Sequence, residues 1–99
     1  MIIEMLEIRY PPGVDKAELK SFWNNVYKPA CKKVGYKMVR SCWIYTGGPM
    51  NMEIFIGELD SLADLQRVET TKEKQEAEAE WQRRFPGAEV TQKILQVVQ

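Results

Sequence analysis

The stretch DKAELKSFWNNVYKPACKKVG, residues 15–35, carries the most regular pattern in the chain. Its apolar side chains recur at alternating steps of three and four residues, which is the spacing of one face of an α-helix. Asp15 suits the N-cap of this helix, and Gly35 suits the position just past its end. Pro29 interrupts the pattern, so we expect a bend or a lost hydrogen bond there. The apolar positions are Leu19, Phe22, Trp23, Val26, Tyr27, Ala30, Cys31 and Val34.

Strand-like segments lie on both sides of this helix. Residues 1–10 are rich in Ile, Leu and Met and end at a Pro-Pro-Gly turn. Residues 36–45 and 50–59 are dense in aromatic, β-branched and other apolar side chains, and the turn at residues 46–49 separates them. Residues 88–98 have the same character. The sequence therefore predicts four strands, of which the second and third are antiparallel neighbours.

A second helical region lies between the third and fourth strands. Ser61 begins a capping box that precedes a short apolar stripe. Residues 72–80 offer almost nothing to bury, which leaves two interpretations open. They are either a solvated helix face or a separate helix started by Thr70, with Glu73 as its capping partner.

The element order predicts an α+β fold of the ferredoxin-like βαββαβ type, in one domain over residues 1–99. Right-handed crossovers put both helical regions on one face of a four-stranded antiparallel sheet. The other face carries Met, Ile, Val and aromatic side chains and is too apolar for water. We therefore expect a homodimer in which two sheets pack face to face as a dimeric α/β barrel.

Composition excludes several classes of function. Fourteen basic and fourteen acidic residues cancel, so the chain lacks the positive field that nucleic-acid binding requires. Histidine is absent, and no cysteine pair has metal-ligand spacing, so we expect neither a metal site nor a cofactor. No apolar run could span a membrane, and residues 1–10 lack the features of a signal peptide. We expect a cytoplasmic protein in which Cys31 and Cys42 are buried, reduced thiols.

Several short motifs recur together along the chain: Glu4, Pro12-Gly13, the Pro29 to Gly35 spacing, Gly48 to Asn51, Asp60 to Ala63 and Glu80-Trp81-Gln82. These residues resemble the NIPSNAP-like branch of the dimeric α/β barrel superfamily, and the resemblance covers nearly the whole chain. The Tyr10-Pro11-Pro12 turn and the strand around Asn51 and Phe55 are also similar to muconolactone isomerase.

The chain departs from the NIPSNAP pattern at four positions. Leu6 and Ile8 stand where the family carries an arginine and a tyrosine, and Phe55 and Gly57 replace a histidine and a tryptophan. The resemblance implies the fold and a cavity between the sheet and the helices. It also implies relatives that include cofactor-free monooxygenases, which bind polycyclic aromatic substrates and stabilise an enolate-like intermediate.

In this fold, side chains from the first helix and from the second and third strands face a ligand. The candidate catalytic residues are Arg40, Tyr36, Tyr45 and Glu4. Arg40 would stabilise negative charge, and the tyrosines would donate hydrogen bonds. The candidate ligand-binding residues are Trp23, Asn24, Tyr27, Trp43 and Phe55. The same aromatic residues are equally typical of a core, and Arg40 of a surface side chain.

Acidic residues offer a second route to catalysis. Glu4, Glu7, Glu53 or Glu58 would have a raised pKa if buried in a barrel, and each could then shuttle a proton as in an isomerase. We prefer Glu4, which lies inside the first strand. Two hypotheses follow. The first is a homodimer that binds a small hydrophobic or aromatic molecule, with use of the cavity by a monooxygenase or isomerase left open. The second is a non-catalytic interaction domain with a filled core. An empty pocket of roughly 300 Å³ would favour the first.

Overall fold

A computed structural model of the protein describes residues 1–44 and 51–98. Tyr45 and the turn predicted at residues 46–49 lie outside this range. The order of strands and helical regions is as predicted. The elements are β1 (Ile2–Arg9), α1 (Lys16–Phe22), the π-helix η1 (Trp23–Tyr27), α2 (Lys28–Val34), β2 (Met38–Trp43), β3 (Met52–Leu59), α3 (Leu62–Glu69), α4 (Lys72–Arg84) and β4 (Glu89–Gln96).

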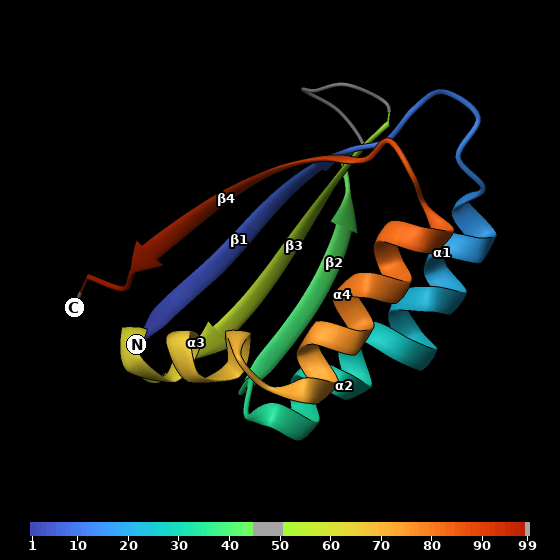
Figure 1. Ribbon diagram of the computed structural model, residues 1–99. Coiled ribbons are helices and arrows are strands. Elements are labelled where there is room, and N and C mark those ends of the chain that lie inside the picture. Colours follow the sequence, from blue (N-terminus) through green and yellow to red (C-terminus); the bar gives the residue numbers. More distant parts are fainter. Residues whose placement is uncertain (45–50, 99) are drawn as a thin grey trace.

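The four strands form one antiparallel sheet in the order β2-β3-β1-β4. Figure 1 shows the helices on one side of this sheet. Side chains of β1 and β3 alternate between buried and half-buried, because every second one points into the helix layer. The predicted ferredoxin-like fold is confirmed. No helix among the described residues is long and apolar enough to cross a membrane.

The first helical region is continuous, but it contains a wide turn that the sequence did not predict. The side chain of Asp15 caps α1, as expected, by accepting from the backbone N–H groups of Ala17 and Glu18. In η1 the N–H of Lys28 bonds the carbonyl oxygen of Trp23, five residues back. Pro29 lacks an N–H, and the π-helical turn just before it takes the place of the predicted bend.

The region after β3 is two helices, and Thr71 rather than Thr70 is the N-cap of α4. The Thr71 hydroxyl accepts from the backbone N–H of Lys74. Residues 72–80 were expected to bury almost nothing, but the Lys74 side chain is only 1% exposed. This expectation was wrong because α4 packs against α2 and brings Lys74 under a set of carboxylates described below.

The sheet face opposite the helices carries half-buried apolar side chains, among them Ile3 and Met5 on β1 and Ile54 and Ile56 on β3. All residues of β4 are exposed, and Figure 1 shows this strand diverging from the helices. Cys31 is buried as expected, whereas Cys42 is exposed. The prediction of a buried Cys42 was wrong because it lies on the uncovered face of β2, at the edge of the sheet.

Candidate functional site

A cavity of about 450 Å³ opens between the first helical region and strands β2 and β3. Its walls come from the elements that the sequence analysis expected to face a ligand. Three of the predicted ligand-binding residues, Trp23, Asn24 and Trp43, line it. The lining residues are Lys16, Ala17, Lys20, Trp23, Asn24, Lys28, Ser41, Trp43 and Glu53. We call this space the Glu53 cavity.

Glu53 is the acid of this cavity. It lies on β3 opposite Trp43 of β2 and opposite Ile8 of β1, and it is only 2% exposed. The Tyr10 hydroxyl donates a hydrogen bond of 3.0 Å to its Oε1 atom, and the Trp81 indole N–H donates at 3.2 Å to the Tyr10 oxygen. Through these two bonds, Tyr10 and Trp81 hold the Glu53 carboxyl group in place.

Burial raises the pKa of Glu53 to about 7, even though Tyr10, Trp23 and Lys28 each act to lower it. The cause is loss of hydration, which penalises the charged carboxylate. A carboxyl group with this pKa holds and releases its proton near neutral pH. That is the property a general acid–base residue needs.

Two polar atoms beside Glu53 are buried without a hydrogen-bond partner among residues 1–44 and 51–98. They are Nε1 of Trp23 and Oγ of Ser41. An unsatisfied buried donor costs roughly 1–3 kcal/mol, so such atoms are rare in folded proteins. The Trp23 N–H lies near enough to Glu53 to lower its pKa but does not meet the geometry of a hydrogen bond to it. Both residues line the cavity, where a ligand oxygen could accept a hydrogen bond from each. The cavity thus combines a proton acceptor with two uncommitted hydrogen-bond donors.

The π-helical turn contributes directly to this arrangement. It places Trp23 and Asn24 at the cavity, while Trp23 also packs on Phe55 with ring centroids 5.9 Å apart and nearly parallel planes. π-Helical turns are frequent at functional sites because they displace side chains from regular helical spacing. Phe55 itself is fully buried beneath Trp23, so the structure places this predicted ligand-binding residue in the core.

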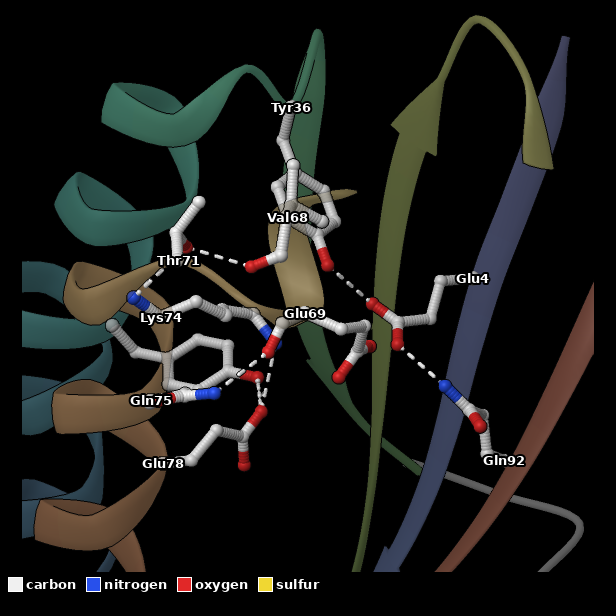
Figure 2. Close-up of polar contacts among 10 residues, drawn as sticks. Glu4, Tyr36, Val68, Glu69, Thr71, Lys74, Gln75, Glu78 and Gln92 are labelled. Carbon is white, nitrogen blue, oxygen red and sulfur yellow. Dashed lines mark hydrogen bonds and ion pairs between the residues drawn. The ribbon is translucent and has the colours of Figure 1, made fainter. Parts of the chain in front are cut away.

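A second group of polar side chains surrounds Glu4 on β1, in contact with a smaller hollow of about 250 Å³. Glu4 is 1% exposed. Figure 2 shows its two oxygens accepting hydrogen bonds of 2.7 Å, one from the Tyr36 hydroxyl and one from the Gln92 amide. Glu4 and Tyr36, two of the predicted catalytic residues, are therefore brought together, and each is committed to a partner within the chain.

Lys74 joins this group from α4. Its ammonium group lies 2.7 Å from Glu78, which also accepts a hydrogen bond of 2.6 Å from Tyr27. Burial acts to lower the pKa of Lys74, but Glu78 and Glu4 more than offset it and hold that pKa above its usual value. In Figure 2 the Glu69 side chain lies between Glu4 and Lys74. We call this set the Glu4 cluster: Glu4, Tyr27, Tyr36, Glu69, Lys74, Glu78 and Gln92.

The pKa of Glu69 lies above its usual value, chiefly because of burial. The positive charge of Lys74 acts to lower this pKa, and the neighbouring Glu4 carboxyl group acts to raise it. The effect of Glu4 arises because two carboxylates cannot both be charged cheaply at short range. Burial also raises the pKa of the Cys31 thiol to about 12, so it stays protonated beside this cluster. Within the Glu4 cluster, the carboxyl groups of Glu4 and Glu78 and the Lys74 ammonium group thus all have partners inside the protein.

The structure separates Arg40 from both sites. Arg40 was expected near a ligand, but it is exposed and lies opposite Ile56 on the uncovered sheet face. That expectation was wrong because Arg40 and Trp43 are three residues apart on one strand and so point to opposite faces. Tyr45 lies outside the described residues. Ser41 and the lining lysines Lys16, Lys20 and Lys28 were not predicted, although strand alternation from Trp43 places Ser41 on the cavity face.

No family model and no curated protein matches the chain. Solved structures do match over nearly all of it. A NIPSNAP domain protein from Burkholderia xenovorans has a TM-score of 0.69 and 19% identity, with 99% of this chain and 95% of that one covered. A putative antibiotic biosynthesis monooxygenase from Deinococcus radiodurans has a TM-score of 0.76 and 8% identity, with 100% and 94% covered. HapK from Hahella chejuensis has a TM-score of 0.77 and 16% identity, with 99% and 93% covered.

These similarities show that the chain has the fold shared by NIPSNAP-type and antibiotic biosynthesis monooxygenase-type proteins, as the sequence resemblance implied. At such low identity they show the fold alone. One fold hosts many unrelated functions, so activity must be argued from the site itself.

Proposed function

We propose that the protein binds a small hydrophobic carbonyl compound in the Glu53 cavity and moves a proton on it. The observation that carries this proposal is a buried carboxyl group beside two buried hydrogen-bond donors that lack partners in the described chain. The apolar walls supplied by Trp23 and Trp43 suit an aromatic or other flat ligand. In this proposal the protein is an isomerase, and it acts in the cytoplasm.

The chemistry follows from the three groups. The Glu53 carboxylate takes a proton from the carbon next to the ligand's carbonyl group, and the electrons of that C–H bond move onto the carbonyl oxygen. The Trp23 N–H and the Ser41 hydroxyl donate hydrogen bonds to the resulting enolate oxygen. In a ligand with a C=C bond one carbon further along, the enolate is a dienolate, and Glu53 returns the proton to its far carbon while the oxygen's electron pair re-forms the C=O bond, which completes an isomerisation. The alternative reaction is that of a cofactor-free monooxygenase, in which the same enolate would react with dioxygen.

The direct test is hydrogen–deuterium exchange at the carbon next to the carbonyl of 2-tetralone in D₂O, followed by NMR. The wild-type protein should accelerate exchange, and Glu53→Gln should abolish the acceleration, since a general base contributes roughly 10²- to 10⁴-fold. The rate should rise with pH through the pKa of Glu53, about 7.

Glu58→Gln is the matched control because Glu58 lies on the same strand but on the opposite face of the sheet. This variant should catalyse hydrogen–deuterium exchange on the ketone at the wild-type rate. If the wild-type protein gives no acceleration over buffer, while the ketone still perturbs the tryptophan signals, the cavity binds without catalysis. A protein that neither binds nor exchanges 2-tetralone would favour the alternative of a non-catalytic interaction domain.

A second copy of the chain is the partner in this proposal. The uncovered face of the sheet carries the apolar side chains of Ile3, Met5, Ile54 and Ile56, and β4 adds Leu95, which is 41% exposed. Charged side chains of both signs also lie on this face, for example Lys93 paired with Glu7 at 2.8 Å, so two copies would not repel each other. Burying such a face stabilises a domain this small.

Native mass spectrometry and sedimentation at micromolar concentration test this association. The wild-type chain should be a dimer, and Ile54→Lys, in the centre of the uncovered face, should be a monomer. Lys72→Glu on the exposed side of α4 should remain a dimer. A wild-type monomer would contradict the association and leave the cavity chemistry to be tested on the monomer.

A further inference from the structure

The mouth of the Glu53 cavity is strongly cationic, although the chain as a whole has no net charge. Lys16 and Lys20 on α1 and Lys28 on α2 all line it, and Glu53 is the only acid among the lining residues. None of the three ammonium groups forms a salt bridge with an acid in residues 1–44 and 51–98. Three uncommitted cations therefore surround one opening.

Lys16 has a placement that helix stability does not explain. It is the first residue of α1, where the positive end of the helix disfavours a cation. Its ammonium group instead lies 4.8 Å from the centre of the Trp43 ring, at the wall of the cavity. A cation held over an aromatic ring and free of a carboxylate partner is available to bind an anion.

Lys28 shows that this positive charge reaches into the cavity. It is one of the groups that act to lower the pKa of Glu53, so its field is felt at the buried carboxyl. At neutral pH the Glu53 carboxyl group is only partly ionised, because its pKa is about 7. Its negative charge therefore neutralises less than one of the three positive charges of the lysines. The cavity therefore has aromatic walls, buried donors inside and an excess of positive charge at its mouth.

From this arrangement we infer that the ligand is an acidic one: a flat, apolar molecule whose carbonyl or hydroxyl oxygen meets Trp23 and Ser41, and whose carboxylate or phenolate lies among the three lysines. This inference rests on the proposed function, since it names the ligand class of the same cavity. A neutral hydrocarbon would leave the lysines unused, and an amine would be repelled by them.

The test compares three probes of one shape: 2-naphthoate, the neutral 2-naphthamide and the cation 2-naphthylmethylammonium. Binding is measured by calorimetry and by the shifts of the three tryptophan indole N–H signals in ¹H–¹⁵N spectra. Naphthoate should bind at least about tenfold more tightly than naphthamide, and the ammonium compound should bind least. Raising the salt concentration should weaken the binding of naphthoate but not that of naphthamide, because salt screens the attraction between the carboxylate and the lysines.

Lys16→Gln and Lys20→Gln should each weaken naphthoate binding by roughly two- to fivefold, the effect of one exposed ion pair, and leave naphthamide binding unchanged. Lys33→Gln is the matched control, because it removes an equal charge from α2 at a residue that does not line the cavity. It should bind naphthoate as the wild type does.

Two failures can be told apart. If naphthamide or the ammonium compound binds as tightly as naphthoate, the acidic ligand class is wrong while the cavity remains a binding site. If none of the probes moves an indole signal, both the ligand class and the proposed binding function are overturned.

Discussion

Glu4 and Glu53 lie on neighbouring strands, point to the same face of the sheet and are almost fully buried. Their surroundings differ. Both oxygens of Glu4 accept hydrogen bonds, and the nearby Lys74 carries the opposite charge. Glu53 accepts a single hydrogen bond from the described residues, that of Tyr10, and faces a cavity with two unpartnered donors. Burial alone therefore does not mark a functional acid: the chain itself supplies the partners of Glu4, whereas the donors beside Glu53 are left for a ligand.

The largest expected effect comes from breaking the Glu4 cluster. Lys74→Met removes the ammonium group that lies among Glu78, Glu4 and Glu69 and leaves their negative charge without compensation. Removing one partner of a buried ion pair costs roughly 3–5 kcal/mol. Urea unfolding at pH 7 should show a loss of this size in the free energy of unfolding.

Lys72→Met is the control for this prediction. Lys72 begins the same helix and pairs with Glu76 at 3.8 Å, but its side chain is 83% exposed. An exposed pair contributes about 0.5 kcal/mol, so this variant should unfold almost as the wild type does. Equal, small losses in both variants would contradict the view that Lys74 holds the cluster together.

Glu53→Gln should act in the opposite direction and stabilise the protein. The pKa of Glu53 in the folded state is about 7, above the ordinary value of 4.5 that applies to the unfolded chain. The folded state therefore retains the proton more strongly, and the carboxyl group destabilises the fold progressively as pH rises from 4.5 to 7. Each unit of pKa difference corresponds to about 1.4 kcal/mol, which makes the full cost above pH 7 on the order of 3 kcal/mol.

The measurement is urea unfolding of Glu53→Gln and wild type at pH 4, 6 and 8. Glutamine keeps an oxygen for the Tyr10 hydroxyl and cannot ionise. The variant should gain about 2–3 kcal/mol at pH 8, less at pH 6 and almost nothing at pH 4. A gain that is the same at every pH, or a loss at pH 8, would show that ionisation of Glu53 does not burden the fold.

The fold could be predicted from the sequence because local patterns and tertiary packing agree. Six of the eight apolar positions between Leu19 and Val34 are buried, and the other two, Val26 and Ala30, are half-buried. Asp15 caps the helix as the sequence indicated. The π-helical turn could not be predicted in the same way, since Pro29 shows that regular bonding must fail but not which irregular turn replaces it.

The site was predicted only in part. Trp23, Asn24 and Trp43 line the cavity because the helix and strand that carry them were placed correctly. Lys74 looked solvated because its partners come from elements distant in sequence, which no local pattern reveals. Arg40 is a different case, since strand alternation relative to Trp43 already places it on the other face. Glu53 was among the predicted acids, but Glu4 was preferred because it lies inside the first strand, and no local pattern distinguished Glu53 from it.

A smaller effect should come from single hydrogen bonds within the Glu4 cluster. Tyr36→Phe removes one of the two hydrogen-bond donors to Glu4. Because Glu4 is almost fully buried, water cannot take the place of the lost hydroxyl group. The cost should be about 2 kcal/mol, as for other hydrogen bonds to charged groups. Tyr27→Phe should cost less, about 1 kcal/mol, because Glu78 is partly exposed and keeps Lys74. Thermal unfolding of both variants measures the difference, and the reverse order would contradict this account of Glu4.

The smallest effect is expected at Arg40, which belongs neither to the Glu4 cluster nor to the Glu53 cavity. Arg40 is exposed on the face away from the helices, so its guanidinium cannot reach a ligand in the Glu53 cavity of the same chain. Arg40→Gln should change the free energy of unfolding by less than about 0.5 kcal/mol and the affinity for 2-naphthoate by less than about twofold. Calorimetry beside Lys16→Gln makes the contrast direct, because both variants lose one positive charge. A tenfold loss in Arg40→Gln would mean that the uncovered face takes part in binding, and that a second copy of the chain brings its arginine to the ligand.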